Sequence, residues 1–278
     1  MDCSWQQLMH CFDPIALSVG SFQITWYALC FLLAWWSAYV LFSYFEKKRD
    51  EHERLSEQKR ESLFWWLLLA AFLGARLGYA FFYAPEYFLH HMSELFIPYD
   101  FKEHVWTTLR GMSYHGGLLG VGVGVLYWAK IHEVSWLSLG DKLALVAPVI
   151  SFFGRIGNFF NQELPGKVTA MEWGMYFPEQ VVLRHPVMLY SALLEGIFIL
   201  GIMLWGQKKF EQKGQLLWLY LFSYGGLRLI IENWREPDPG VSLFLDFFSR
   251  GQMLSFGMIF IAFFGWFFYS KRATIEST

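Results

Sequence analysis

Seven long apolar stretches constrain this chain more than any other feature of its sequence. They lie at 22–45, 62–83, 112–131, 139–160, 186–205, 215–234 and 251–270. Each is long enough to cross a bilayer as a helix, which takes about 20 mostly apolar residues. The chain of 278 residues is 55% hydrophobic and 17% charged, too apolar for an ordinary soluble protein. We therefore predict an all-α integral membrane protein with seven transmembrane helices, built as a single transmembrane domain over 1–278.

The distribution of Lys and Arg predicts how these helices face. Successive connections between spans lie on alternate sides of the membrane. The connections on one side, together with the C-terminus, carry 13 of the 22 Lys and Arg residues, and those on the other side carry 6. The remaining three, Arg76, Arg155 and Arg228, lie inside spans. Cytoplasmic loops are richer in Lys and Arg, so we expect a periplasmic N-terminus and a cytoplasmic C-terminus. The first twenty residues lack a basic segment, so the first span is expected to be retained. A net charge of −2 gives no indication of nucleic-acid binding.

Two further segments carry structural predictions. Glycines recur at four-residue spacing in Gly74–Gly78 and in Gly116–Gly120–Gly124, a pattern typical of closely packed membrane helices. The connection 84–110 is aromatic and amphipathic, and we expect it to form an external arm along the membrane surface.

The three cysteines, Cys3, Cys11 and Cys30, lie within the first thirty residues. No metal-ligand spacing is present, so neither a metal nor a cofactor is predicted. Three unpaired thiols are the expectation, with a Cys3–Cys11 disulfide as the alternative. No cysteine falls near the polar residues described next, which disfavours a cysteine nucleophile.

Polar residues inside the spans indicate a functional site. Given the predicted orientation, Arg76, Arg155, Asn158, Arg228 and Glu232 all fall toward the outer ends of their spans. Arginine at the centre of a membrane helix costs about 2.5–3.5 kcal/mol, so these side chains must face the bundle interior. Arg228 could simply pair with Glu232, and Arg76 with backbone carbonyls. One local carboxylate cannot balance both Arg155 and Arg228, however, and guanidinium forks suit phosphate, which predicts a lipid phosphate site.

His115 lies at the outer end of the third span, in the string SYHGG. An isolated histidine is more often structural. Here the neighbouring glycines permit close approach of a substrate, and a neutral imidazole can accept a proton from a thiol or hydroxyl. We therefore count it as a candidate base.

The segment GRIGNFFNQELPG, Gly154 to Gly166, closely resembles the signature of the bacterial prolipoprotein diacylglyceryl transferase family. Further matches keep the family's order along nearly the whole chain. They are SYHGG at 113–117, YGGLRLIIENWREPD at 224–238, GARLGYAFFY at 74–83, WY at 26–27 and RHP at 184–186.

This resemblance implies a seven-span enzyme of the bacterial inner membrane with its active site toward the periplasmic leaflet. It implies transfer of a diacylglyceryl group from phosphatidylglycerol to the lipobox cysteine of a prolipoprotein signal peptide, without a cofactor. The implied catalytic residues are His115, Arg155 and Arg228. The implied substrate-binding residues are Tyr27, Asn158, Glu163, Gly166, Tyr224 and Glu232, and the position of Arg76 inside a span adds that residue.

Three positions depart from the family pattern. Met188 and Ser191 stand where a Gln and a Glu are expected after RHP, and Arg110 replaces a glycine before MSYHGG. These departures bear on the surroundings of Tyr190 and on the substrate entrance.

Two other classes of protein compete with this reading. A transporter of anionic lipids or organic phosphates would also use buried arginines and glycine-rich helices, but the polar residues cluster at one depth and no inverted repeat is visible. An intramembrane protease would need a serine in a nucleophile setting, which the sequence does not offer.

Overall fold

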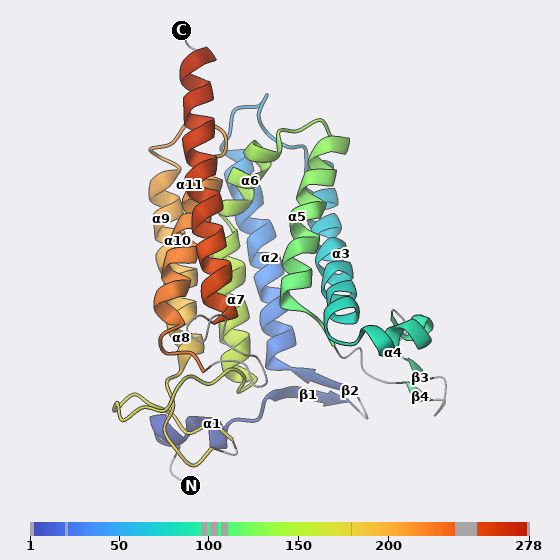
Figure 1. Cartoon of the computed structure of the whole chain (residues 1–278), viewed down its shortest axis with the longest axis vertical. Helices are drawn as coiled ribbons and strands as arrows, with labels where there is room; N and C mark the ends of the chain where they lie inside the picture. The colour runs from blue at the N-terminus through green and yellow to red at the C-terminus, as the bar shows by residue number, and fades with distance from the viewer. Residues whose placement is uncertain are drawn as a thin grey trace. The chain divides into compact units, whose positions relative to one another are not determined.

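The computed structural model describes residues 3–19, 22–95, 99, 100, 105, 106, 111–178, 180–236 and 249–276. These residues form mainly helices, together with two short antiparallel hairpins (Figure 1). The chain divides into two compact units. The larger comprises 1–45 and 140–278, and the smaller comprises 46–139.

The larger unit begins with η1 (Trp5–Gln7), α1 (Leu8–Cys11) and the strands β1 (Ile15–Val19) and β2 (Phe22–Thr25). These strands pair with Ile15 opposite Thr25 and Val19 opposite Phe22. The first span was predicted from residue 22, but α2 (Trp26–Lys47) begins only after this hairpin. Phe22, Ile24 and Thr25 are aromatic or β-branched residues, which favour a strand when a partner strand is present.

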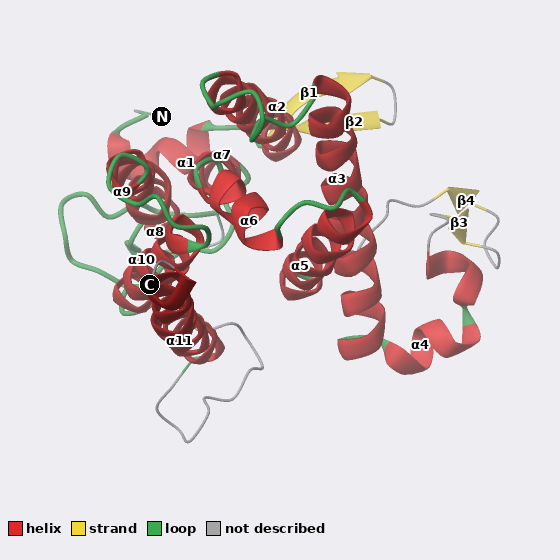
Figure 2. Ribbon diagram, turned by 90° about the horizontal axis from the view of Figure 1, so that it is seen from above, coloured by secondary structure: helices red, strands yellow, loops and turns green. Residues whose placement is uncertain are grey.

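Helix α6 (Trp136–Ala144) begins in the smaller unit and ends in the larger one. The helices of the larger unit continue with α7 (Ala147–Phe160), α8 (Val187–Ser191), η3 (Ala192–Phe198), α9 (Ile199–Gly206), α10 (Gln215–Ile231) and α11 (Arg250–Glu276). The predicted span 139–160 is bent by 46° between α6 and α7. Pro148 lies in the first turn of α7 and lacks an amide hydrogen, which accounts for a helix start there. α10 and α11 lie side by side in both ribbon views (Figures 1 and 2).

The smaller unit contains α3 (Glu57–Phe82), α4 (Pro85–His90), η2 (Met92–Leu95), β3 (Tyr99–Asp100), β4 (Val105–Trp106) and α5 (Tyr114–Ile131). Helices α3 and α5 pack through glycines, as the small-residue spacing predicted. A Cβ at Gly116 would lie 2.3 Å from the carbonyl oxygen of Gly74, and one at Gly78 would lie 2.7 Å from the Cα of Gly116. Residues 84–95 of the predicted arm form α4 and η2, and its surface location stays a prediction.

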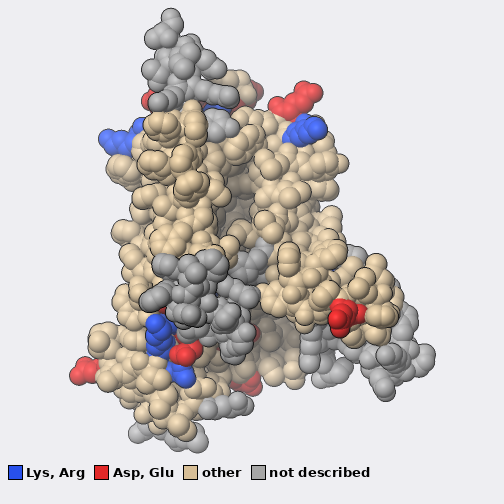
Figure 3. All heavy atoms as spheres, in the orientation of Figure 1, with Lys and Arg blue, Asp and Glu red and all other residues tan. Residues whose placement is uncertain are grey.

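All seven predicted spans contain helix. Of the helices in the described ranges, α2, α3, the continuous run Val187–Gly206 and Gly251–Phe268 are long and apolar enough to cross a membrane. The bent pair α6–α7 adds a fifth span if counted as one, and Gly116–Ile131 and Gln215–Ile231 are shorter apolar helices. On the face drawn in Figure 3, the described surface along the middle of the helices shows no Lys, Arg, Asp or Glu, as expected for contact with lipid.

Candidate functional site

Two arginines predicted for the site lie together in the larger unit, joined by a carboxylate that the sequence analysis overlooked. Arg155 on α7 donates from Nε to Glu195 Oε2 at 3.1 Å, and Arg228 on α10 donates from Nη1 to Glu195 Oε1 at 3.3 Å. Glu195 is completely buried, whereas the arginine side chains are 18% and 13% exposed. The expectation that only one carboxylate lies near these arginines is therefore wrong.

Glu232 extends this cluster toward the end of α10 and the start of α11. Its Oε2 lies 3.3 Å from Arg228 Nη2, and its Oε1 lies 3.3 Å from Arg235 Nη1. Ser249 also donates its hydroxyl to Oε1, at 2.7 Å. The local pairing of Arg228 with Glu232 is thus formed, as the structural alternative proposed. Three guanidinium groups and two carboxylates meet here, and we call these five side chains the arginine cluster.

Glu195 reaches the cluster because of an irregular stretch of helix. The segment η3 is a π-helix, which has about one more residue per turn than an α-helix. The side chains that follow therefore point in other directions than they would in a regular α-helix. The next residue, Gly196, packs directly on α7. A Cβ at Gly196 would lie 2.6 Å from Phe152 Cβ. Close approach of η3 to α7 therefore brings Glu195 within reach of Arg155.

The signature loop after α7 is held by amide–carboxylate hydrogen bonds. Asn158 donates from Nδ2 to Glu163 Oε2 at 3.1 Å, and Asn161 donates to Glu163 Oε1. Glu163 is exposed and Asn158 is partly buried. Glu163 thus fixes the orientation of Asn158, which lies one turn beyond Arg155 on α7.

Gly166 closes this loop against two other segments. Its amide donates to the carbonyl of His185 at 2.9 Å, and it forms an antiparallel bridge with Arg235. A Cβ at Gly166 would lie 2.3 Å from Val187 Cγ2 and 2.6 Å from the Trp234 carbonyl oxygen, so only glycine fits. Arg184 donates from Nη1 to the Gly166 carbonyl and to Glu236 Oε2, both at 3.0 Å.

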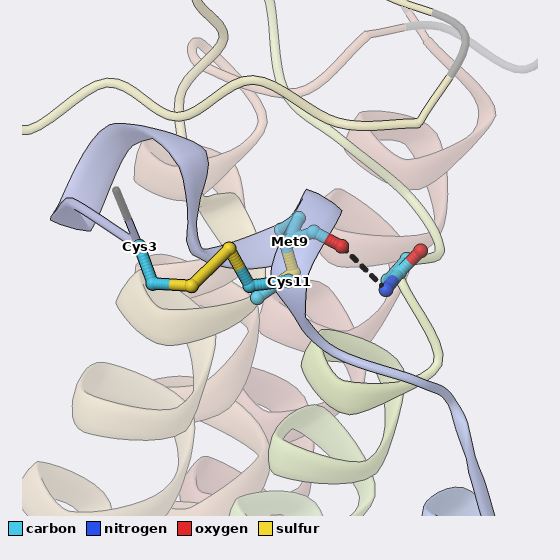
Figure 4. The surroundings of a disulfide bond; sticks show 4 residues. Cys3, Met9 and Cys11 are labelled. Carbon is cyan, nitrogen blue, oxygen red and sulfur yellow. Dashed lines mark hydrogen bonds between the residues drawn. A yellow bond between two sulfur atoms is a disulfide. The ribbon is translucent and has the colours of Figure 1, made fainter. Parts of the chain in front are cut away.

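Gln162 lies beyond the helix that carries Arg155 and Asn158. Helix α7 ends at Phe160, and Gln162 has a φ of 60°. Its side chain donates to the carbonyl of Met9 at 2.9 Å (Figure 4, dashed line) and to that of Phe12 at 2.7 Å. The signature loop therefore also anchors the N-terminal segment.

A disulfide closes that N-terminal segment. Cys3 and Cys11 are bonded, with their Cα atoms 6.0 Å apart (Figure 4). Cys30 is a buried free thiol. The expectation of three unpaired thiols is therefore wrong, and the alternative pairing is correct. The spacing alone did not decide the matter, because the two cysteines meet through the turn of η1 and α1.

The two predicted tyrosines lie on different helices of the larger unit. Tyr27, in the first turn of α2, packs against α7, since a Cβ at Gly157 would lie 2.9 Å from Tyr27 Cδ2. Tyr224 lies one turn before Arg228 on α10 and stacks obliquely on Tyr220, with ring centroids 5.8 Å apart. The substrate-binding roles of both residues stay predictions.

Arg76 and His115 belong to the smaller unit. Arg76 is buried and donates to three backbone carbonyls, those of Leu95, Gly111 at 3.0 Å and Glu94 at 2.7 Å. Its guanidinium also lies 4.9 Å from the centre of the Phe88 ring. These contacts support the structural alternative for Arg76, in which it secures the segment after α3.

The side chain of His115 lies outside the described residues, as does Arg110. The backbone of His115 lies in the first turn of α5, whose N-cap Ser113 accepts from the amide of Gly116 at 3.2 Å. The Ser113 amide in turn donates to the Ala75 carbonyl of α3 at 2.9 Å. These hydrogen bonds fix the backbone on both sides of His115.

The two departures from the family pattern in α8 are buried. Met188 packs with Met9, Phe159, Met175 and Phe177 in an apolar cluster, and Ser191 is 1% exposed. Nearby, Tyr190 receives a hydrogen bond from Trp173 at 2.8 Å and lies 3.0 Å from His185 Nδ1. Within the described ranges, no group of three or more His, Cys, Asp and Glu side chains is arranged to hold a metal ion.

The chain is similar to known proteins over nearly its whole length. A family model described as prolipoprotein diacylglyceryl transferase matches residues 14–268. The chain is 37% identical over 270 residues to the phosphatidylglycerol–prolipoprotein diacylglyceryl transferase of Wolinella succinogenes, covering 96% of this chain and 97% of that protein. The protein of the same name from Campylobacter jejuni is 38% identical, covering 93% and 94%. That from Idiomarina loihiensis is also 38% identical, covering 90% of each chain.

Proposed function

The chain belongs to the prolipoprotein diacylglyceryl transferase family, and from this membership we propose that it transfers the diacylglyceryl group of phosphatidylglycerol to the lipobox cysteine of prolipoproteins. It is an enzyme of the membrane rather than a transporter of anionic lipids. The observation that carries the proposal is the similarity over nearly the whole chain to proteins of this name. The guanidinium groups of Arg155 and Arg228, which share Glu195, provide positive charge suited to the phosphate of phosphatidylglycerol.

In the proposed reaction, the cysteine sulfur of the prolipoprotein attacks the glyceryl carbon that carries the phosphate. A carbon–sulfur bond forms and the carbon–oxygen bond to phosphate breaks, so the products are a thioether-linked diacylglyceryl group and glycerol phosphate. The thiol proton leaves to His115 as base. The enzyme contributes no thiol of its own, in keeping with the disulfide of Cys3 and Cys11 and the burial of Cys30.

Arg155 and Arg228 bind the phosphate and stabilise the negative charge that develops on the leaving group. Both arginine side chains retain some exposed surface while their guanidinium groups contact the buried Glu195, an arrangement proposed to hold them in fixed positions for a ligand. Asn158, oriented by Glu163, and Tyr27, which packs on Gly157 of α7, are proposed to contact the headgroup and the lipid. Gly166, Tyr224 and Glu232 support these groups, and the role of Arg76 is structural.

We propose seven transmembrane spans in the inner membrane, with the N-terminus and the active site toward the periplasm. The Lys and Arg bias of the loops supports this orientation. The Cys3–Cys11 disulfide supports it too, because disulfides persist in the oxidising periplasm and are rare in the cytoplasm. Fusion of a cytoplasm-only fluorescent reporter to the C-terminus tests it: fluorescence is expected, and a dark but stable fusion would reverse the topology.

The reaction is tested in liposomes that contain phosphatidylglycerol and a synthetic lipobox peptide. Mass spectrometry is expected to find a diacylglyceryl adduct on the peptide cysteine with the wild-type protein and none with Arg155→Ala. Liposomes of phosphatidylethanolamine alone serve as the control. If His115→Ala keeps the wild-type rate, the assignment of the base is wrong while the function stands. If the folded wild-type protein forms no adduct in any lipid, the proposed function is wrong and lipid-flux assays are the next step.

A further inference from the structure

Glu195 is the one carboxylate of the arginine cluster that lies inside an apolar helix and contacts both arginines assigned to the phosphate. We propose that Glu195 is a positioning residue that spaces Arg155 and Arg228 and lowers the positive charge of the pair, so that the site takes a phosphodiester and releases a phosphomonoester. This inference rests on the proposed function and extends it to a residue that no motif in the chain's resemblance to the family includes.

The geometry shows how one side chain can set the spacing of two others. Glu195 uses its two oxygens on different partners, Oε2 on Arg155 Nε and Oε1 on Arg228 Nη1, at 3.1 and 3.3 Å. Its carboxylate is 0% exposed, so water cannot take the place of either arginine. Two guanidinium groups repel each other at short range, and a buried carboxylate between them lets both remain charged side by side.

The surrounding backbone is built to keep Glu195 at this point. The π-helical segment Ala192–Phe198 is flanked by regular helix on both sides, and segments of this kind occur frequently at functional sites. Phe152 of α7 lies so close to Gly196 that a side chain at position 196 would clash with it. Both features cost helix stability relative to a regular Ala-containing helix, and both bring Glu195 against Arg155.

The charge of the phosphate changes during the proposed reaction, and Glu195 is placed to respond to that change. Phosphatidylglycerol carries a phosphodiester with one negative charge, whereas a phosphomonoester carries about −1.5 to −2 near pH 7. Two arginines without Glu195 would therefore favour the product over the substrate. One buried negative charge next to both arginines reduces that preference and permits the product to leave.

The test compares Glu195→Gln with Glu195→Asp. The amide keeps the size of Glu195 and removes its charge, whereas aspartate keeps the charge and is too short to reach both arginines. With Glu195→Gln we expect inorganic phosphate, the probe for the monoester, to inhibit at concentrations about tenfold lower than with the wild type. The KM for phosphatidylglycerol should change much less, and kcat should fall. With Glu195→Asp, kcat should fall while inhibition by phosphate stays near the wild-type value.

Glu46→Gln is the matched control. Glu46 is also a buried carboxylate, 1% exposed, but it pairs with Arg49 and the Leu55 amide in the smaller unit. Its loss should lower thermal stability and leave phosphate inhibition unchanged. A merely structural Glu195 would behave differently from the proposal, since its loss would loosen the arginines and weaken the binding of phosphate. Unchanged or weaker inhibition in Glu195→Gln would therefore overturn the inference.

A second readout needs no turnover. Inorganic phosphate should raise the thermal unfolding midpoint of detergent-solubilised Glu195→Gln at lower concentration than it does for the wild type. An equal or smaller phosphate effect in the variant counts against the inference. If the wild type forms no peptide adduct, the proposed function fails, and the phosphate titrations still test the charge effect of Glu195.

Discussion

Gly166 and Arg235 face each other in an antiparallel backbone bridge that joins the signature loop to the segment after α10. Arg235 is also ion-paired with Glu232, which contacts Arg228. One chain of contacts therefore leads from the loop that follows Arg155 to the second arginine. The loop therefore stabilises the arginine cluster, in addition to providing Glu163, which orients Asn158.

Gly166→Ala is expected to destabilise the protein. The new methyl group would overlap Val187 and the carbonyls of Trp234 and His185, and overpacking of this kind costs about 1–3 kcal/mol. Thermal unfolding in detergent measures the effect. Gly154→Ala is the matched control in the same motif, because no atom lies within 4 Å of a Cβ there. Equal unfolding midpoints for the two variants would contradict the prediction.

Arg228→Lys is expected to lower kcat/KM for peptide modification about 100-fold, the usual scale for losing an electrostatic donor at a reacting group. Arg228 uses different nitrogens for Glu195 and Glu232, and a lysine ammonium cannot reproduce this planar fork. Arg49→Lys, at an ion pair of the smaller unit, should leave kcat/KM unchanged. Activity of Arg228→Lys above half the wild-type value would show that one positive charge is sufficient there.

The disulfide predicts a specific pattern of thiol labelling. Protein denatured without reductant should take up one maleimide, on Cys30, and three after reduction. Replacing Cys3 and Cys11 by serine should reduce the unfolding free energy by about 2.5 kcal/mol, the chain-entropy estimate for a loop of this length. Uptake of three maleimides before reduction would rule out the pairing.

His185 predicts a dependence of stability on pH. Burial lowers the pKa of His185 below its ordinary value of about 6.5, so the unfolded chain binds a proton there more readily than the folded protein. The unfolding free energy should therefore decrease as the pH falls below about 6.5. Thermal unfolding from about pH 7.5 to about pH 5.5 measures this loss, and His185→Asn should reduce it. Parallel curves for both proteins would assign the pH dependence to other groups.

The sequence predicted well those features that depend on composition and short-range spacing. Apolar length located a helix in every predicted span, and the glycine spacing predicted close helix packing, which the structure shows between Gly74 and Gly116. The hairpin of β1 and β2 was missed because two strands of four or five residues carry little periodicity. The bend before α7 has a local signal in Pro148, which the apolar run concealed.

The arginine cluster was predicted in part. Arg155, Arg228 and Glu232 were found because charges inside membrane helices are costly and therefore informative. Glu195 carries the same signal, a carboxylate within the apolar string ALLEGIF, and the same rule would have identified it. Its partners could not have been deduced, because the π-helix shifts the face on which Glu195 lies relative to a regular period. Ser249 and the Gly166–Arg235 bridge depend on contacts between segments far apart in the chain.

The hydrogen bonds from Gln162 to the Met9 and Phe12 carbonyls have a consequence for biosynthesis. Phe12 and Gln162 are 150 residues apart, which corresponds to about 8–30 s at translation rates of about 5–20 residues per second. The Cys3–Cys11 loop needs only its own few residues and can close during that interval. The segment that contains Met9 and Phe12 is thus synthesised well before the loop that anchors it, and a pause in synthesis before residue 162 leaves that segment without its anchor.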